Sequence, residues 1–213
     1  MPTEEQDVKQ QLIATAMRLF ATHGRDGVSL RDIASEAGVT HGSIRYHFGT
    51  KDKLYIEALQ RFCSVSDLFG EPQCSGIPAA SSQSDGEHQL TEFIHRFVTA
   101  QAHLGQDKAA SAGMLQAEFA RGDGPDPAFY KRIIKPGHDH VIGIIGRIRP
   151  DITDDKTLEI LAFNVIFQCV MIRIGQPVIK KRLASRRLSK ADVTRIAESI
   201  AEITIGGLRA FKR

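Results

Sequence analysis

Two short amphipathic stretches separated by a glycine, SLRDIASEAGVTHGSIRYHF at 29–48, constrain this chain more than any other feature. Each stretch is about two helical turns long, and helices that short are unstable in water unless they pack against other elements. Ala34 is small enough to let a second helix approach closely, and Gly38 suits a turn that requires a positive φ. Ile44 anchors the second stretch. Other apolar residues complete the shared core: Ile33, Val39 and Phe48. The spacing predicts a helix-turn-helix.

Further helices are expected on both sides of this motif. Residues 7–23 repeat apolar side chains with the 3.6-residue period of an amphipathic helix. Ser29 stands in the N-cap position of the first motif helix, and Asp32 follows three residues later, as in a capping box. Thr40 can cap the second motif helix, and Thr50 opens a fourth helix. These flanking helices would supply the packing that the two short helices need.

The second motif helix lies in a stretch, residues 37–51, that contains no Asp or Glu. Its polar side chains are donors for phosphates and for base edges in the major groove of DNA. Arg45 and Lys51 supply positive charge, and Gly42 lets the backbone come close to a groove wall. The remaining donors are Thr40, His41, Ser43, Tyr46 and His47. The alternative interpretation is that the helix pair is a solvated part of an all-α core.

The run SLRDIASEAGVTHGSIRYHFGTKDKL resembles the DNA-binding domain of TetR-type transcriptional regulators, over roughly residues 8–56. The resemblance implies backbone contacts from Ser29 and Arg31, and a phosphate contact from Lys51, which opens the fourth helix. It also implies DNA-facing residues at both ends of the recognition helix: Thr40, His41, Gly42 and Ser43, then Tyr46 and His47. Arg45 departs from the family, which often has tyrosine there. An arginine can grip a phosphate or read a guanine edge.

The rest of the chain has helical patterns and no strand pattern, so we predict an all-α fold. It would consist of an N-terminal three-helix DNA-binding domain with a helix-turn-helix and a larger helical-bundle domain for effector binding and dimerisation. We expect the first at 1–54, a fourth helix that connects to about residue 69, and the second at 55–213. Residues 70–86 are expected to be a loop or linker. Further helices are expected at 87–104, 108–121, 129–134, 138–148, 154–175 and 190–211.

Helix boundaries in the second half follow local signals. Asp126 is expected to be the N-cap of a helix with Pro127 in its first position. Pro136 and Gly137 are expected to kink or break the helical region that follows. Ser189, with Asp192, is expected to cap the last helix. The basic run KKRLASRRLSK at 180–190 is better interpreted as a solvated connector than as a DNA contact.

The stretch MLQAEFARGDGPDPAF, followed by IIKPGHDH, is similar to the C-terminal domain of the CecR-type subgroup. The TetR resemblance implies a ligand-responsive regulator, in the simplest case a repressor that leaves its operator when an effector binds. We expect a small apolar or amphipathic effector within 87–175, near the Pro136-Gly137 break. Its candidate walls are Phe93, Phe97, Met114, Phe119, Phe163 and Phe167, with Gln116, His138 and Gln168 for a polar end. Taken singly, each of these aromatic residues is more often plain core.

A homodimer is expected, because a single small motif makes few contacts and two copies suit a palindromic operator. The helices near 154–175 and 190–211 have apolar faces wider than one core stripe requires, so we place the interface there. The residues that make these faces wide are Leu158, Leu161, Val165, Ile172, Val193, Ile196, Ile200 and Leu208.

Other functional classes find little support. His138 and His140 are two residues apart on a helix, so their rings diverge and no metal is expected. No Ser/His/Asp or Cys/His set and no glycine-rich phosphate loop is evident, so no cofactor and no catalysis are expected. An all-helical enzyme or interaction protein that uses the motif as a scaffold is the competing class. The polar start, the three cysteines and the lack of a long apolar run favour the cytoplasm and argue against a membrane.

Overall fold

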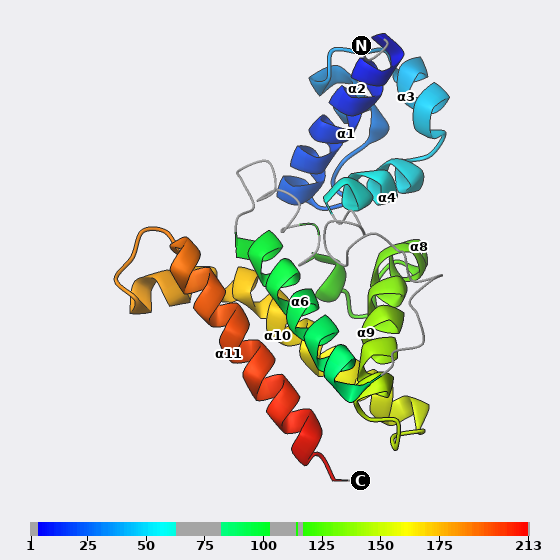
Figure 1. Cartoon of the computed structure of the whole chain (residues 1–213). Helices are drawn as coiled ribbons and strands as arrows, with labels where there is room; N and C mark the ends of the chain where they lie inside the picture. The colour runs from blue at the N-terminus through cyan, green and yellow to red at the C-terminus, as the bar shows by residue number, and fades with distance from the viewer. Residues whose placement is uncertain (1–3, 63–81, 103–113, 115–116, 213) are drawn as a thin grey trace. The chain divides into compact units, whose positions relative to one another are not determined.

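The computed structural model describes residues 4–62, 82–102, 114 and 117–212. Every regular element in these ranges is a helix, which confirms the all-α fold class (Figure 1). The α-helices are α1 (Glu4–His23), α2 (Leu30–Glu36), α3 (His41–Phe48), α4 (Lys51–Phe62), α6 (Gln83–Ala102), α8 (Pro127–Phe129), α9 (Lys135–Ile148), α10 (Asp155–Arg182) and α11 (Lys190–Ala210). The segment η2 (Tyr130–Ile134) is a single π-helical stretch between α8 and α9.

Contacts divide the chain into two compact units. The first contains α1 to α4, and α1 packs along both α2 and α4. Most of the predicted core of the helix-turn-helix is confirmed, because Ile33, Ala34, Ile44 and Phe48 are buried between these helices, whereas Val39 is half-buried. Local signals act as expected here. Gly24 and Gly38 adopt positive φ at the two turns, and the side chains of Ser29 and Thr40 cap α2 and α3.

The first unit also contains a segment distant in sequence, the described residues between 114 and 133. Asp126 caps α8 as predicted, accepting hydrogen bonds from the N–H groups of Ala128 and Phe129. Of the two outcomes expected at Pro136 and Gly137, a kink or a break, the break is wrong, because the helical backbone continues from α8 through the π-helical η2 into α9. Pro136 lies in the first turn of α9, directly after the π-helical stretch η2, and Gly137 is buried.

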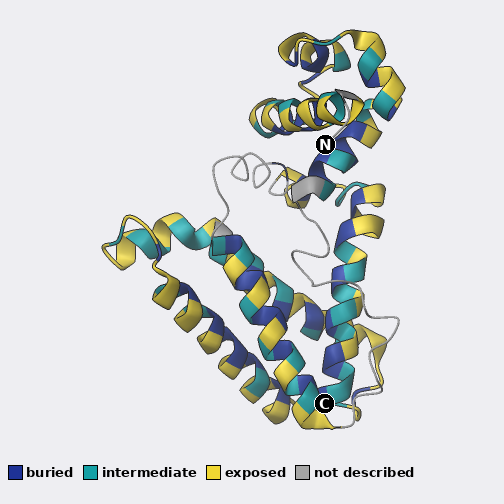
Figure 2. Ribbon diagram, turned by 45° about the horizontal axis from the view of Figure 1, so that its top comes forward, coloured by how far each residue is buried: buried dark blue, intermediate teal, exposed yellow. Residues whose placement is uncertain are grey.

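The second unit is a bundle in which α6 packs against α9, α10 and α11 (Figure 1). Each helix turns an apolar face inward, and the outer faces are largely exposed (Figure 2). Helix α6 begins earlier than predicted, at Gln83, so residues 83–86 of the expected linker are helical. Gly86 lets this first part of α6 pack closely against α9, since a Cβ there would lie 2.9 Å from Ile148 Cγ1 on α9. Residues 70–81 of that linker, and most of the helix expected at 108–121, lie outside the described residues.

Helix α10 extends past its predicted end at Gly175 and continues to Arg182. Its halves, Asp155–Ile172 and Ile174–Arg182, are bent by 58° relative to each other. Pro177 explains a bend at this place, because it cannot donate to the carbonyl of residue 173 and its ring crowds that carbonyl. Within the described ranges, no single helix is long and apolar enough to cross a membrane. Only the two halves of α10 taken together pass that test.

Candidate nucleic-acid interface

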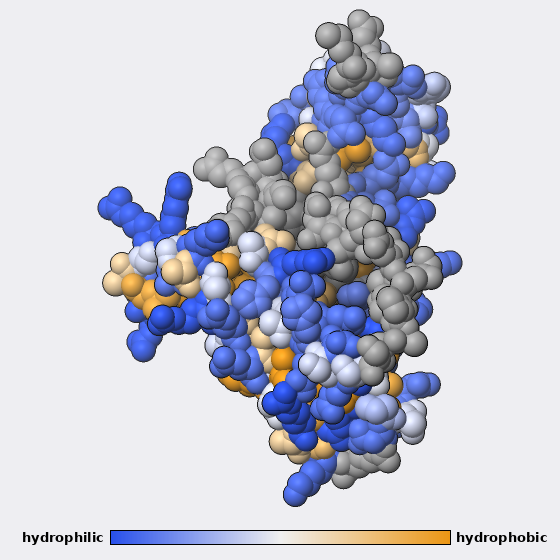
Figure 3. Space-filling view, in the orientation of Figure 1, coloured by the Kyte–Doolittle hydropathy of each residue, from blue (hydrophilic) through white to orange (hydrophobic). Residues whose placement is uncertain are grey.

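The outer face of α3 carries the predicted contact residues. His41, Gly42, Arg45 and Tyr46 are exposed, while Ser43 and His47 are half-buried. Beneath them the helix is fixed by Ile44, which is fully buried. The rings of Tyr46 and His47 meet edge to face, with centroids 5.1 Å apart. The visible surface of this unit is mainly hydrophilic (Figure 3), as a surface for a charged partner requires.

The hydroxyl groups at the starts of α2 and α3 have structural partners. Thr40 Oγ1 accepts a hydrogen bond from the N–H of Ser43 at 3.2 Å, and the two hydroxyl oxygens lie 3.0 Å apart. Ser29 and Asp32 form the reciprocal capping box predicted for α2. The hydrogen bonds from Ser29 lower the pKa of Asp32. These contacts hold the ends of both helices in the conformation that would face a nucleic acid.

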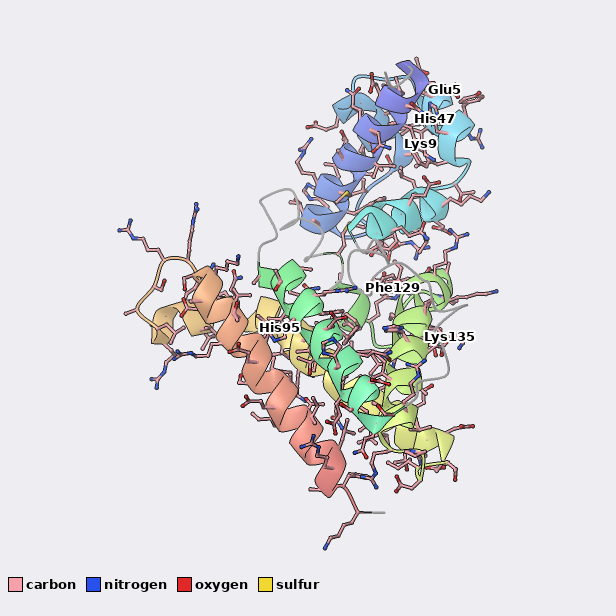
Figure 4. The ribbon with its side chains drawn as sticks, viewed as in Figure 1. Glu5, Lys9, His47, His95, Phe129 and Lys135 are labelled. Carbon is pink, nitrogen blue, oxygen red and sulfur yellow. The ribbon has the colours of Figure 1, made fainter. Side chains whose placement is uncertain are left out.

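Three further cationic residues of the first unit lie on helices other than α3. Arg31 is exposed on α2, while Lys51 lies at the start of α4 and donates to the backbone carbonyl of Arg25 at 3.0 Å. Lys9, on α1, pairs with Glu57 at 2.9 Å and lies over the ring of Phe48. Figure 4 labels Glu5 and Lys9 on α1 and His47 on α3 in this unit.

Arg25, which the sequence did not single out, connects three parts of the first unit. Its guanidinium lies 2.6 Å from Asp52 on α4 and 2.8 Å from Asp126, the N-cap of α8. It also lies over the ring of Tyr55, 5.3 Å from the centroid. Burial would lower the pKa of Arg25, but its bonds to Asp52 and Asp126 outweigh that and raise it. Arg25 is therefore a fixed cation.

A buried carboxylate lies beside this cation. Glu118 is only 2% exposed and accepts hydrogen bonds from Tyr55 Oη at 2.9 Å and from the N–H of Asp126 at 2.8 Å. Burial, with the hydrogen bond to Glu118, raises the pKa of Tyr55 far above its usual range. Burial would also raise the pKa of Asp126, but the hydrogen bonds from Arg25 and from the α8 backbone lower it. The sequence motif GDGPDP predicts that Asp126 caps a helix, but it does not predict the contacts of Asp126 with Arg25 and Glu118.

The sequence matches two described protein families. Residues 12–58 match bacterial regulatory proteins of the tetR family, and residues 86–208 match the C-terminal domain of the HTH-type transcriptional dual regulator CecR. The second match alone covers more than half of the chain. This chain belongs to the TetR family. Its C-terminal domain is of the CecR type, as the sequence resemblance predicted.

Named relatives of this TetR-family chain are transcriptional regulators. CecR of Shigella flexneri is 25% identical over 190 residues, covering 82% of this chain and 83% of that protein. The probable acrEF/envCD operon repressor of Escherichia coli K12 is 38% identical over 86 residues. That match covers 40% of this chain and only 37% of the repressor's length. FadR of Bacillus subtilis, solved in complex with stearoyl-CoA, shares the fold with a TM-score of 0.61 and 17% identity, covering 93% of this chain and 98% of that one.

The predicted effector residues of the TetR-family chain fall into separate groups. Met114 and Phe119 belong to the first unit, where Met114 is buried and Phe119 exposed, and Gln116 lies outside the described residues. In the second unit, Phe93 and Phe97 are buried on α6, and the ring of Phe93 lies 5.9 Å from that of His140. Burial, and to a lesser extent Arg147, lowers the pKa of His140.

The remaining three aromatic candidates form a surface cluster on α9 and α10. Phe163 and Phe167 stack with centroids 5.3 Å apart, and each is about half exposed (52% and 48%). His138 Nδ1 lies 3.6 Å from Glu159, and its ring lies 6.3 Å from that of Phe163. Gln168 is exposed and donates to the carbonyl of Asn164. Phe163 and Phe167 therefore lie at the surface of the second unit, whereas Phe93 and Phe97 lie in its core.

In the part of the chain that the structure describes, no group of three or more His, Cys, Asp and Glu could hold a metal ion. Cys169 is buried in α10, and burial raises the pKa of its thiol to about 12, which keeps it protonated and unreactive.

Proposed function

We propose that this TetR-family regulator binds double-stranded operator DNA through the outer face of α3, with support from α2 and the start of α4. The observation that carries the proposal is an exposed helix face without carboxylates, fixed from below by Ile44 and Phe48. The base-facing residues would be Thr40, His41, Gly42, Ser43, Arg45, Tyr46 and His47. Ser29, Arg31 and Lys51 would contact the DNA backbone.

The proposal includes a homodimer, because two recognition helices on one palindrome need a fixed spacing of about one DNA turn, ~34 Å. Apolar side chains at intervals of three or four residues are exposed on α10 and support an interface there: Ile160, Phe163, Phe167, Met171, Ile174 and Val178. Ile203 on α11 is 69% exposed. A row of this length is unusual on the surface of a monomer.

The residues that sequence reasoning assigned to this interface require a correction. Val165, Val193, Ile200 and Leu208 are buried within the chain, and Leu158, Leu161, Ile172 and Ile196 are only half exposed. The four buried residues belong to the core of the bundle, in which α6 packs against α9, α10 and α11. The proposed interface therefore keeps the predicted helices and uses the exposed row on α10, with Ile203 on α11.

The effector is proposed to be a small apolar or amphipathic molecule whose binding releases the operator. FadR of Bacillus subtilis, which shares this fold, was solved with stearoyl-CoA, an amphipathic molecule. The chain's second unit is rich in buried Phe, Ile, Leu and Val, as a site for an acyl chain requires. Lowering DNA affinity ten- to a hundredfold requires a preference for the non-binding state of ~1.4–2.8 kcal/mol.

DNA binding can be tested by fluorescence anisotropy with labelled duplexes that tile the region upstream of the protein's own gene. We expect one duplex with an inverted repeat to bind in the nanomolar range and a shuffled duplex to bind at least a thousandfold more weakly. Both affinities should fall between 50 and 200 mM salt. Equal affinity for every duplex would contradict an operator-binding function.

The effector class can be tested on the same complex. Stearoyl-CoA is added to the protein bound to its operator, with coenzyme A alone as the control for the polar part. Release by the acylated molecule alone, accompanied by a higher melting temperature, is the expected result. Absence of both effects across acyl chains of different length would contradict an amphipathic effector of this kind.

A further inference from the structure

The proposed phosphate contact of Lys51 depends on a turn that has little rigidity of its own. Arg25, whose carbonyl accepts the Lys51 ammonium at 3.0 Å, follows Gly24, which has a φ of +73°, and Gly27 comes two residues later. Glycines leave a turn with many accessible backbone conformations. The direction of this carbonyl must therefore be fixed by other contacts, and the side chain of Arg25 provides them.

The Arg25 side chain is held from two sides. Asp52 lies next to Lys51 in the first turn of α4, and Asp126 caps α8, so one guanidinium joins both elements to the turn. The Arg25 side chain is only 18% exposed, and that of Asp126 only 16%, so water screens this pair less than a surface pair. The Tyr55 ring beneath the guanidinium closes the third side.

We infer that Arg25 is a positioning residue for DNA binding: its bridge between Asp52 and Asp126 sets the placement of Lys51, and Asp126 controls that bridge. The inference rests on the proposed function and extends it to regulation. Asp126 is itself fixed, because its N–H donates to buried Glu118, which also accepts from Tyr55 on α4. The segment 117–126 is thereby tied to α4 directly by the Glu118–Tyr55 hydrogen bond, and indirectly by the bridge from Asp126 through Arg25 to Asp52.

Asp126 is also the point where this segment enters α8, and the helical chain continues from there through η2 into α9. A conformational change that shifts the start of this helical run moves the Asp126 carboxylate relative to Arg25. The Arg25 bridge then weakens, the turn relaxes and Lys51 loses its support. An effector bound among the later helices could thus lower the affinity for DNA phosphates without touching α3.

Asp126→Asn is the sharpest variant for a test. The Asn side-chain carbonyl still accepts from Ala128 and Phe129, so the helix cap is kept, since Asn is as good an N-cap as Asp. The amide nitrogen that replaces the other oxygen cannot accept from Arg25. Asp123→Asn is the matched control, because it removes the same charge from the same segment at an exposed site paired with Arg121.

The measurement is the full-length protein's affinity for a labelled duplex between 50 and 200 mM salt. Because each lost phosphate contact lowers the slope of log K against log salt by ~0.9, Asp126→Asn and Lys51→Ala should each show that change. Asp126→Asn should also bind about tenfold more weakly at the lowest salt, as for one lost charge-assisted contact. In the Lys51→Ala background, Asp126→Asn should cause no further change of slope. Asp123→Asn should keep the wild-type slope.

Two results would overturn the inference. Asp126→Asn could behave like Asp123→Asn, which would make the bridge purely structural. It could instead raise the slope, which would mean that a released Arg25 binds phosphate itself. Melting temperatures show whether Asp126→Asn has a folding defect. If it does, Asp52→Asn, which removes the other acceptor of the Arg25 bridge, is measured in its place, and its salt slope is interpreted in the same way. If wild-type protein binds no duplex in a salt-dependent way, the proposed function fails. If only Lys51→Ala weakens binding, the positioning role of Arg25 alone fails.

Discussion

Arg45 is the residue whose role in DNA binding depends most directly on its place in α3. It follows buried Ile44 and is itself exposed, so its guanidinium extends from the proposed DNA-facing surface. We expect Arg45→Ala to weaken operator binding by ~1–3 kcal/mol and to relax specificity at one base pair if Arg45 reads a base. If it contacts a phosphate instead, all sequences should weaken about equally, with a salt slope lower by ~1.

Anisotropy titrations on the operator and on its single-base variants distinguish these two roles of Arg45. Arg96→Ala is the control, because it removes an equal charge from α6 in the other unit, where Arg96 pairs with Glu92. Wild-type affinity of Arg45→Ala at both 50 and 200 mM salt would show that Arg45 does not touch DNA.

Protonation of the His140 side chain is expected to lower the stability of the second unit. Burial lowers its pKa below the ordinary value near 6.5, so the unfolded chain takes up the proton at a higher pH than the folded chain. The stability contributed by neutral His140 is therefore complete above about pH 6.5 and is lost as the pH falls through the lower, folded pKa. Melting temperatures between pH 7.5 and 5.5 should fall more steeply for wild type than for His140→Gln. The same slope in both proteins would contradict this assignment, and His88→Gln, at an exposed site, is the control.

Capping determines where the last helix begins. Ser189 Oγ accepts from the N–H of Asp192 at 3.1 Å, and the Asp192 carboxylate accepts from the N–H of Ser189 at 2.9 Å. We expect Ser189→Ala to reduce the free energy of unfolding by ~1 kcal/mol, because the N–H of Asp192 loses its acceptor and the Asp192 carboxylate loses the hydroxyl donor. Urea denaturation measures this loss. Ser199→Ala is the matched control within α11: it removes a hydroxyl that donates only to the carbonyl of Ile196, and alanine favours a helix interior. Equal losses of unfolding free energy in Ser189→Ala and Ser199→Ala would show that the Ser189 cap does not stabilise α11.

Helix ends were predictable where one residue and its near neighbours decide them. Ser29, Thr40, Asp126 and Ser189 each carry their signal within three residues of the helix they cap, and each caps as predicted. Prolines were harder to interpret. Pro136 was expected to kink or break a helix, and the helix does not break there, while α10 continues past Pro177 with a bend. A proline destabilises a helix by removing one hydrogen bond, and the packing around it determines whether the helix ends there.

Contacts between distant parts of the chain were not predictable from local pattern. The partners Arg25 and Asp126 are 101 residues apart, and neither residue type nor spacing identifies the pair. The faces of α10 show the same limit. Their apolar residues were recognised, but which of them face inward depends on where α6 packs. Sequence periodicity gives the presence of an apolar face, and the neighbouring helices decide which residues remain exposed.

The exposed residues of α10 determine the expected assembly of the whole molecule. Phe167 stacks on Phe163 near the middle of the exposed row, so a second copy seated there would bury both rings. Phe167→Glu would place an unpaired carboxylate in that interface at a cost of several kcal/mol, enough to dissociate a micromolar dimer. Light scattering should give the mass of a dimer for wild type and of a monomer for the variant. Thr99→Glu, which adds the same charge at an exposed site on α6, should remain a dimer.

The loss of the dimer should in turn weaken operator binding, because a monomer contacts one half-site and forfeits the contacts of the second recognition helix. We expect Phe167→Glu to bind the full palindrome no more tightly than an isolated half-site, while Thr99→Glu keeps the wild-type preference for the palindrome. Circular dichroism establishes that the variant monomer is folded. A folded Phe167→Glu protein that remains dimeric at micromolar concentration would move the interface away from this row, and one that is monomeric yet keeps full operator affinity would show that dimerisation through α10 is not what pairs the recognition helices.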